Sequence, residues 1–218
     1  MNWLKRVLGL GAPAPAPTQQ PLRTGPMGLA PQCAVGFDKT ISLLLDGQST
    51  VRIPAEQQVW SEGVIDLGEQ NWLSRYYFDD EDFWLQVQTS GSRDGQVDTV
   101  ILFNYLSSVS ISSTQELSQV AGPHSKVGLP TYTLDGKEYV REWGASDGQT
   151  ELVSFFERVT NPEDKYGVNH QAMLYSRETG LTDRREFLLF SVEEAENGDV
   201  SFSTSLGVSL STTDLRVI

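Results

Sequence analysis

With 218 residues, 39% of them hydrophobic and 10% aromatic, the chain has the length of one domain and enough apolar side chains for a packed core. This composition excludes an intrinsically disordered chain. The formal net charge is −13, and residues 1–30 contain three basic and no acidic residues, so the remainder carries −16. A body this acidic repels phosphate backbones, and we expect it to bind no nucleic acid.

Residues 2–10 predict a short amphipathic helix that ends at glycines. Apolar side chains four positions apart share one face, and two basic residues flank that face. The segment is too short for a stable isolated helix in water, so it would order only against a membrane surface or a partner protein. The candidate membrane-contact residues are Trp3, Leu4, Lys5, Arg6, Val7 and Leu8.

Proline and small residues dominate the next stretch, 11–32, which predicts a flexible linker. We therefore expect a disordered tail over residues 1–32 and a single β-rich domain over residues 33–218. No apolar run approaches the roughly 20 residues that span a bilayer, and Val7–Ala12 is too short for a signal peptide. The expected location is the cytoplasm, with weak peripheral contact at the inner face of the membrane.

Cys33 is the only cysteine, which excludes an intramolecular disulfide and a cysteine-based zinc site within one chain. We expect an inert, buried thiol at this position. The two histidines, His124 and His170, form no metal-binding spacing, and the chain has no glycine-rich phosphate loop. We therefore expect no metal site and no cofactor.

Strand patterns dominate the chain after the linker. Residues 83–89 alternate between two faces, and the apolar run 97–106 is typical of a strand buried on both faces. Residues 200–210 place Val, Phe, Thr and Leu on one face and mainly serine on the other. One face of that strand should meet a core, and the serine face should meet water or a close-packed neighbour.

Two dipeptides predict hairpins. Asp135-Gly136 favours a type I′ turn, and its register would pair Tyr132 with Tyr139. Asn197-Gly198 predicts a second hairpin that leads into the strand at 200–210.

Helical signals are few. Ser113 and Glu116 form a capping box that predicts a short helix ending at Gly122. Residues 40–45 are ambiguous between helix and strand, and residues 152–159 favour a strand. Since no alternation of strands and helices appears, we predict a mainly β fold, at the margin of α+β. It has antiparallel sheets and hairpins with one or two short helices, after a flexible N-terminal tail.

Gly144-Ala-Ser146-Asp-Gly148 matches the Gly-x-Ser-x-Gly pattern of the α/β-hydrolase nucleophile. That motif needs a parallel sheet with crossover helices, whereas here it follows a predicted hairpin strand. We interpret it as a plain turn. No catalytic residues are therefore assigned, and the pattern favours a protein that is not an enzyme.

Arginines on strand faces that otherwise hold aromatic residues either pair with carboxylates or form a binding surface. Both alternatives stay open for the arginines of this chain. The candidate binding residues are Arg141, Trp143, His170, Arg177, Arg184 and Arg185.

Several segments resemble the YjfK-like proteins, a bacterial family of unknown function. They include His-Gln-Ala-Met-Leu-Tyr-Ser-Arg at 170–177, together with residues 181–189, 132–139 and 72–84. The resemblance covers about residues 35–212 and brings no catalytic residues. It implies an association with membrane-stress gene neighbourhoods, beside proteins that look like phage shock protein A and small membrane proteins.

The leading hypothesis is a non-enzymatic binding or scaffold protein near the inner face of the membrane, with an unknown, membrane-associated protein as partner. One alternative is an enzyme with an arginine, histidine and carboxylate site; a deep cavity that gathers His170, Arg141 and acids would favour it. A second alternative is a structural subunit of a homo-oligomer, which an exposed apolar patch would favour.

Overall fold

The computed structural model describes residues 24–144 and 147–218. The predicted helix at 2–10 and the serine of the Gly-x-Ser-x-Gly pattern lie outside these residues. The helices are η1 (Pro26–Gly28), α2 (Lys39–Leu45), α3 (Thr114–Ala121) and η2 (Thr212–Asp214). The strands are β1 (Ala34–Phe37), β2 (Gln57–Gly68), β3 (Asn71–Phe78), β4 (Phe83–Ser90), β5 (Gln96–Ile111), β6 (Thr131–Leu134), β7 (Lys137–Arg141), β8 (Val153–Thr160), β9 (Lys165–Glu178), β10 (Arg185–Ala195), β11 (Val200–Leu210) and β12 (Leu215–Val217).

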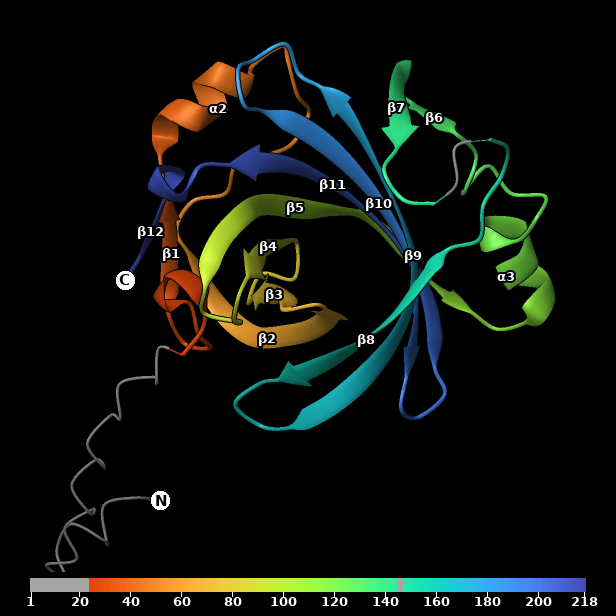
Figure 1. The fold of residues 1–218 in the computed structure, drawn as a ribbon, viewed down its shortest axis with the longest axis horizontal. Coiled ribbons are helices and arrows are strands. Elements are labelled where there is room, and N and C mark those ends of the chain that lie inside the picture. Colours follow the sequence, from red (N-terminus) through yellow and green to blue (C-terminus); the bar gives the residue numbers. More distant parts are fainter. Residues whose placement is uncertain (1–23, 145–146) are drawn as a thin grey trace, which may run out of the picture.

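Eight strands form a closed antiparallel barrel in the order β2-β3-β4-β5-β11-β10-β9-β8. Strand β8 closes it because it pairs with both β9 and β2 (Figure 1). Strands β1 and β12 extend the sheet beyond β2, and the β6–β7 hairpin extends it beyond β9. The prediction of a mainly antiparallel β fold with short helices is confirmed.

Local turn chemistry explains both predicted hairpins. Asp135 and Gly136 both have positive φ, 50° and 75°, as a type I′ turn requires, and Tyr132 pairs with Tyr139. Between β10 and β11, Gly198 takes φ 86° and its N–H donates to the Ala195 carbonyl at 2.9 Å.

The capping residues decide where the helices begin. The Ser113 hydroxyl accepts from the Glu116 N–H, and the Glu116 carboxylate accepts from the Ser112 N–H at 2.7 Å. The ambiguous residues 40–45 are helical in α2, because the Asp38 carboxylate caps the Thr40 N–H at 2.8 Å.

Strand β11 is buried on both faces. Its large side chains, such as Phe202 and Leu206, join the core outside the barrel, while Ser203 and Ser205 face the interior. A Cβ on Gly207 would overlap the Phe103 ring, so the small residues of this face make room for large ones opposite. Of the two environments expected for the serine face, the close-packed neighbour is the one observed.

Residues 24–32 are part of the packed body, in contrast to the linker predicted for them. Leu29 is fully buried in the outer core, and the Gln32 N–H donates to the Val59 carbonyl at 2.8 Å. Composition misled here because a few apolar residues among prolines suffice to dock a segment on a sheet. None of the helices in the described ranges has the length and apolar character needed to cross a membrane.

Candidate functional site

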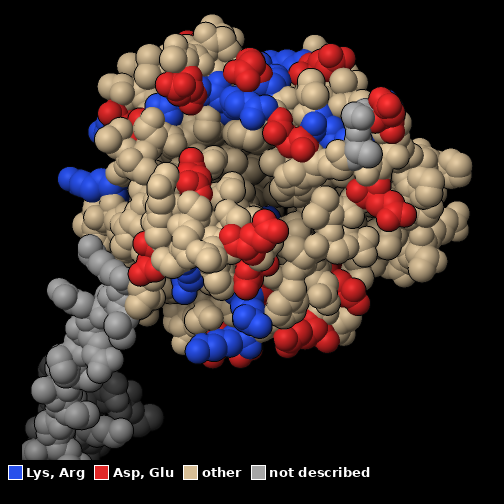
Figure 2. Space-filling view, in the orientation of Figure 1, with Lys and Arg blue, Asp and Glu red and all other residues tan. Residues whose placement is uncertain are grey.

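The barrel interior holds two cavities separated by a layer of side chains, which we call the central layer. Along β3, Leu73 lines a larger cavity of about 900 Å³, Arg75 lies in the layer, and Tyr77 lines a smaller cavity of about 280 Å³. Figure 2 shows the molecule hollowed at the centre of one face, with acidic side chains around the hollow. The central layer consists of Arg75, Trp84, Phe103, Phe155, Glu157 and His170.

A buried ion pair forms the middle of this layer. Arg75 of β3 and Glu157 of β8 are 3% and 0% exposed, and Arg75 Nη1 lies 2.9 Å from Glu157 Oε2. The strand order makes this contact possible, since β2 alone separates β3 from β8. Gly63 on that intervening strand leaves the necessary space, because a Cβ there would overlap the Glu157 carboxylate.

Three side chains contact the buried Glu157 carboxylate: Arg75, Tyr77 and His170. Tyr77 donates its hydroxyl to Oε1 at 2.8 Å, and His170 Nε2 lies 2.9 Å from Oε2. Burial alone would raise the pKa of Glu157. The charge of Arg75 and the contacts of His170 and Tyr77 lower it by more than burial raises it, so the net pKa is below its ordinary value. The carboxylate is therefore ionised.

Aromatic rings enclose the charged groups. The Arg75 guanidinium lies 5.0 Å from the centroid of Trp84 and 5.2 Å from that of Phe155. The His170 ring stacks on Phe155 at 4.9 Å, and its Nδ1 is 3.0 Å from the Ser191 hydroxyl. Ion pairs and stacked rings join the members of this layer, which favours a rigid partition over a group that moves protons.

The larger cavity is lined by apolar and aromatic side chains together with polar and charged ones, Asp66 and Arg158 among them. Gln86 is oriented by the central layer, since its Oε1 accepts from Arg75 Nε at 3.1 Å. Its amide nitrogen donates to no atom of the described residues, so it is available to an occupant. The lining also includes Trp72, Leu73, Gln88, Thr99, Ile101, Phe155, Leu174 and Phe187.

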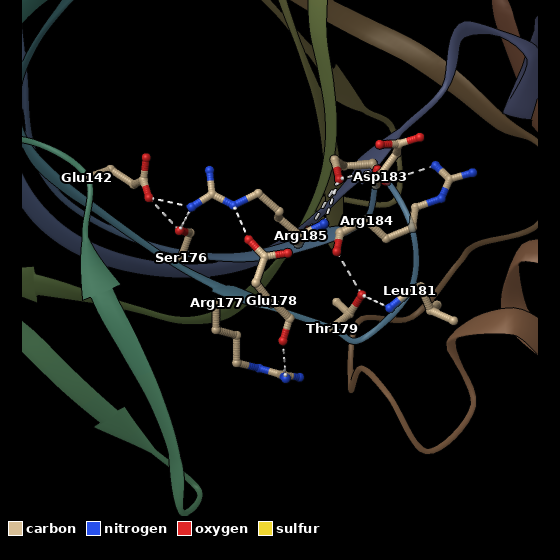
Figure 3. Close-up of polar contacts among 10 residues, drawn as sticks. Glu142, Ser176, Arg177, Glu178, Thr179, Leu181, Asp183, Arg184 and Arg185 are labelled. Carbon is tan, nitrogen blue, oxygen red and sulfur yellow. Dashed lines mark hydrogen bonds and ion pairs between the residues drawn. The ribbon is translucent and has the colours of Figure 1, made fainter.

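Charged residues lie where the larger cavity opens. Arg185 Nη2 is 2.6 Å from Glu142 Oε1 and also contacts Ser176, while its Nε is 3.2 Å from Glu178. Figure 3 shows Arg185 turned toward Glu142 and Ser176. Burial raises the pKa of Glu142, but Ser176 and Arg185 lower it to a net value below the ordinary one. Trp143 lies beside this cluster and also lines the cavity.

Of the six candidate binding residues, the structure brings Trp143 and Arg185 together at the larger cavity and places His170 in the central layer. Arg177 and Arg184 are turned away from Arg185 (Figure 3). Arg177 pairs with Glu186 at 2.7 Å outside the barrel, and Arg184 pairs with Asp214. Arg141 bonds the carbonyls of two loop glycines, Gly128 and Gly148, and lines neither cavity.

Sequence reasoning missed Arg75, Glu157 and Gln86. Arg75 lies among apolar and aromatic residues in a strand, and such a lone charge needs a buried partner. That signal could have indicated Arg75 but not its partner, because Glu157 is 82 residues away. The described residues contain no group of three or more His, Cys, Asp or Glu side chains that could hold a metal ion.

Comparison with known proteins agrees with the resemblance drawn from the sequence segments. The chain matches the family described as "Protein of unknown function (DUF2491)" over residues 3–216. It is 30% identical over 202 residues to the uncharacterized protein YjfK of Escherichia coli (strain K12), which covers 89% of this chain and 91% of that protein. No solved structure matches. The chain belongs to the DUF2491 family of proteins of unknown function.

Proposed function

We propose that the protein binds a small, mainly apolar molecule in the larger cavity of its barrel, without catalysing a reaction. The observation that carries this proposal is the cavity of about 900 Å³, within the size range of small-molecule sites. Eight-stranded barrels have interiors wide enough for one small ligand. A cavity lined by aromatic side chains with a few placed polar groups is typical of such sites.

The polar groups suggest how the ligand is oriented. Gln86 presents its amide nitrogen at the inner end, held there by Arg75, and this donor suits a carbonyl or ether oxygen. Trp143 and the Arg185–Glu142 pair lie at the other end, where a polar group of the ligand would meet water and charge. The ligand class is therefore a molecule with an apolar body and polar ends.

The enzymatic alternative receives less support from the geometry. It needs a carboxylate or histidine that is free to exchange a proton with a substrate. Glu157 instead lies in an ion pair with Arg75, its Oε2 is also 2.9 Å from His170 Nε2, and its Oε1 accepts from Tyr77. Arg141, the third residue of that hypothesis, lines neither cavity.

Binding of the neutral fluorophore N-phenyl-1-naphthylamine to the purified full chain tests the proposal. We expect its emission to rise on binding, with energy transfer from Trp72 and Trp143, both of which line the cavity. Thr99→Trp narrows the cavity and should abolish the signal. Asp98→Trp is the matched control, because Asp98 is the exposed neighbour on the same strand and should leave binding intact. No binding, or equal loss in both variants, would contradict the proposal.

We propose in addition that the protein is cytoplasmic and works as a scaffold beside the membrane, through the basic amphipathic residues 2–10. The membrane-stress context implied by the resemblance to YjfK-like proteins supports this placement. Each basic group near an anionic surface contributes about 1 kcal/mol, which suggests weak and reversible contact. Co-sedimentation with anionic vesicles should be partial, weaken with salt, and disappear in a Trp3→Ala/Leu4→Ala variant. An intact protein that stays in the supernatant at low salt would refute membrane contact.

A further inference from the structure

The smaller cavity, on the opposite side of the central layer, combines aromatic rings with carboxylates. Six aromatic rings line it, those of Trp60, Tyr77, Phe78, Phe83, Tyr105 and Tyr166. Its volume of about 280 Å³ suits a group of only a few heavy atoms. A concave set of rings of this kind is the arrangement by which proteins hold ammonium groups.

The charge of this cavity is negative. Glu81, Glu157 and Glu193 line it, and none of the lysines or arginines among the residues that the structure describes does. Arg75 balances Glu157 from within the central layer. Glu193 forms no ion pair within the described part of the chain; its Oε1 accepts from the Ser203 hydroxyl at 2.7 Å. A carboxylate that no cation of the described residues contacts therefore lies beside the aromatic rings, with the charge of Arg75 acting on it only from a longer distance.

The tyrosines beside Glu193 stay neutral. Burial, with the charge of Glu193, raises the pKa of Tyr105 above its ordinary value. Burial and the charge of Glu157 likewise raise the pKa of Tyr77. Neutral phenol rings have electron-rich faces that attract a cation. They carry no positive charge that would attract an anion.

The geometry points to a second binding site, in the smaller cavity, for a small organic cation with a quaternary or protonated amine. Glu193 supplies the countercharge, and Trp60, Tyr105 and Tyr166 supply ring faces. An anion is disfavoured by the three carboxylates, and a neutral apolar molecule would leave Glu193 without a cation in contact. This site does not depend on the function proposed for the larger cavity.

Calorimetric titration of the full chain with choline, and with its neutral isostere 3,3-dimethyl-1-butanol, tests this inference. The two probes have the same shape and differ in charge, so we expect choline to bind at least about tenfold more tightly. Glu193→Gln keeps an acceptor for Ser203 but removes the charge, and it should weaken choline binding about tenfold. Glu194→Gln is the matched control, since Glu194 is the exposed next residue and does not line the cavity.

Thr99→Trp separates this site from the larger cavity, and it should leave choline binding unchanged. Equal affinity for choline and its isostere would overturn the inference, as would unchanged choline binding in Glu193→Gln. Loss of choline binding in Thr99→Trp would place the cation in the larger cavity and overturn it as well. Failure of N-phenyl-1-naphthylamine to bind, with choline still bound, would contradict only the proposal for the larger cavity.

Discussion

Arg75 and Glu157 place two opposite charges inside the barrel, where neither is solvated by bulk water. Taking both ions out of water costs several kcal/mol each, and the pair recovers this only through good geometry and further hydrogen bonds. Here Gln86, Tyr77 and His170 supply those additional contacts. The pair is therefore costly to break by removing one partner, even though a well-packed apolar pair could replace both.

Glu157→Gln should lower the free energy of unfolding by about 3–5 kcal/mol, because it leaves the Arg75 guanidinium buried without a countercharge. Arg52→Met is the matched control, since Arg52 and Asp82 form an exposed pair at 3.8 Å whose loss should cost less than about 1 kcal/mol. Urea unfolding followed by tryptophan fluorescence measures both. Equal effects would show that the buried pair contributes no more than a surface pair.

The pKa of Glu157 also predicts a pH dependence of stability. A carboxyl whose folded pKa lies below its unfolded value contributes stability above the unfolded pKa, ordinarily 4.5, and loses it as the pH falls through the folded pKa. The free energy of unfolding should therefore fall on acidification below about pH 4.5, and less steeply in Glu157→Gln. Glu142, Glu186 and Asp38 contribute to the slope that remains, since their pKa values are lowered as well. Parallel curves for the two proteins would contradict the assignment to Glu157.

At the scale of elements, the barrel strands β4, β10 and β11 bury both faces, and each face requires a different residue size. On the inner faces, large side chains such as Phe103 and Glu157 lie opposite glycines, Gly207 and Gly63. The outer faces pack instead against the segments that cover the barrel. Small residues inside the barrel are therefore required by packing, although nothing in the local pattern of a strand demands them.

Gly63→Ala should destabilise the protein by about 3 kcal/mol, because its methyl group overlaps the Glu157 carboxylate and forces the ion pair apart. Gly36→Ala, in strand β1, is the matched control. The nearest atom to its new Cβ is 3.9 Å away, so its effect should stay within about 0.5 kcal/mol. Thermal and urea unfolding measure the difference, and a tolerated Gly63→Ala would mean that Glu157 can shift without loss.

At the scale of the whole molecule, residues 24–32 extend the body beyond the boundary that composition predicts. Leu29 fills part of the outer core, and the backbone of Gln32 bonds strand β2. A boundary drawn at residue 33 would therefore remove part of the core.

Two deletions test this boundary. Removing residues 2–32 should lower the free energy of unfolding by about 2–5 kcal/mol, the usual cost of losing a buried leucine. Removing residues 2–23 should change it by less than about 0.5 kcal/mol, because the composition of 11–23 predicts a linker. Urea midpoints and soluble yield distinguish the two. Equal stability of both variants would restore the boundary at residue 33.

The sequence by itself determined the features that depend on neighbouring residues. Asp135-Gly136 specifies a turn because both residues tolerate positive φ, and Ser113 with Glu116 begins a helix because their side chains bond its first N–H groups. Alternation along 200–210 likewise indicates a strand with two unlike faces. These signals act over a few positions, so they can be interpreted without the fold.

Only the tertiary structure decided which distant residues meet. Strand β8 closes the barrel by pairing with β2, 94 to 98 positions earlier in the chain, and this closure brings Glu157 to Arg75. The same closure completes the layer between the two cavities. The register of β9 with β10 places Arg185 opposite Glu178 and Arg177 opposite Glu186, on different faces of the sheet. Pairing between remote strands depends on the packing of the whole chain, and for that reason the candidate sites could not be derived from local pattern.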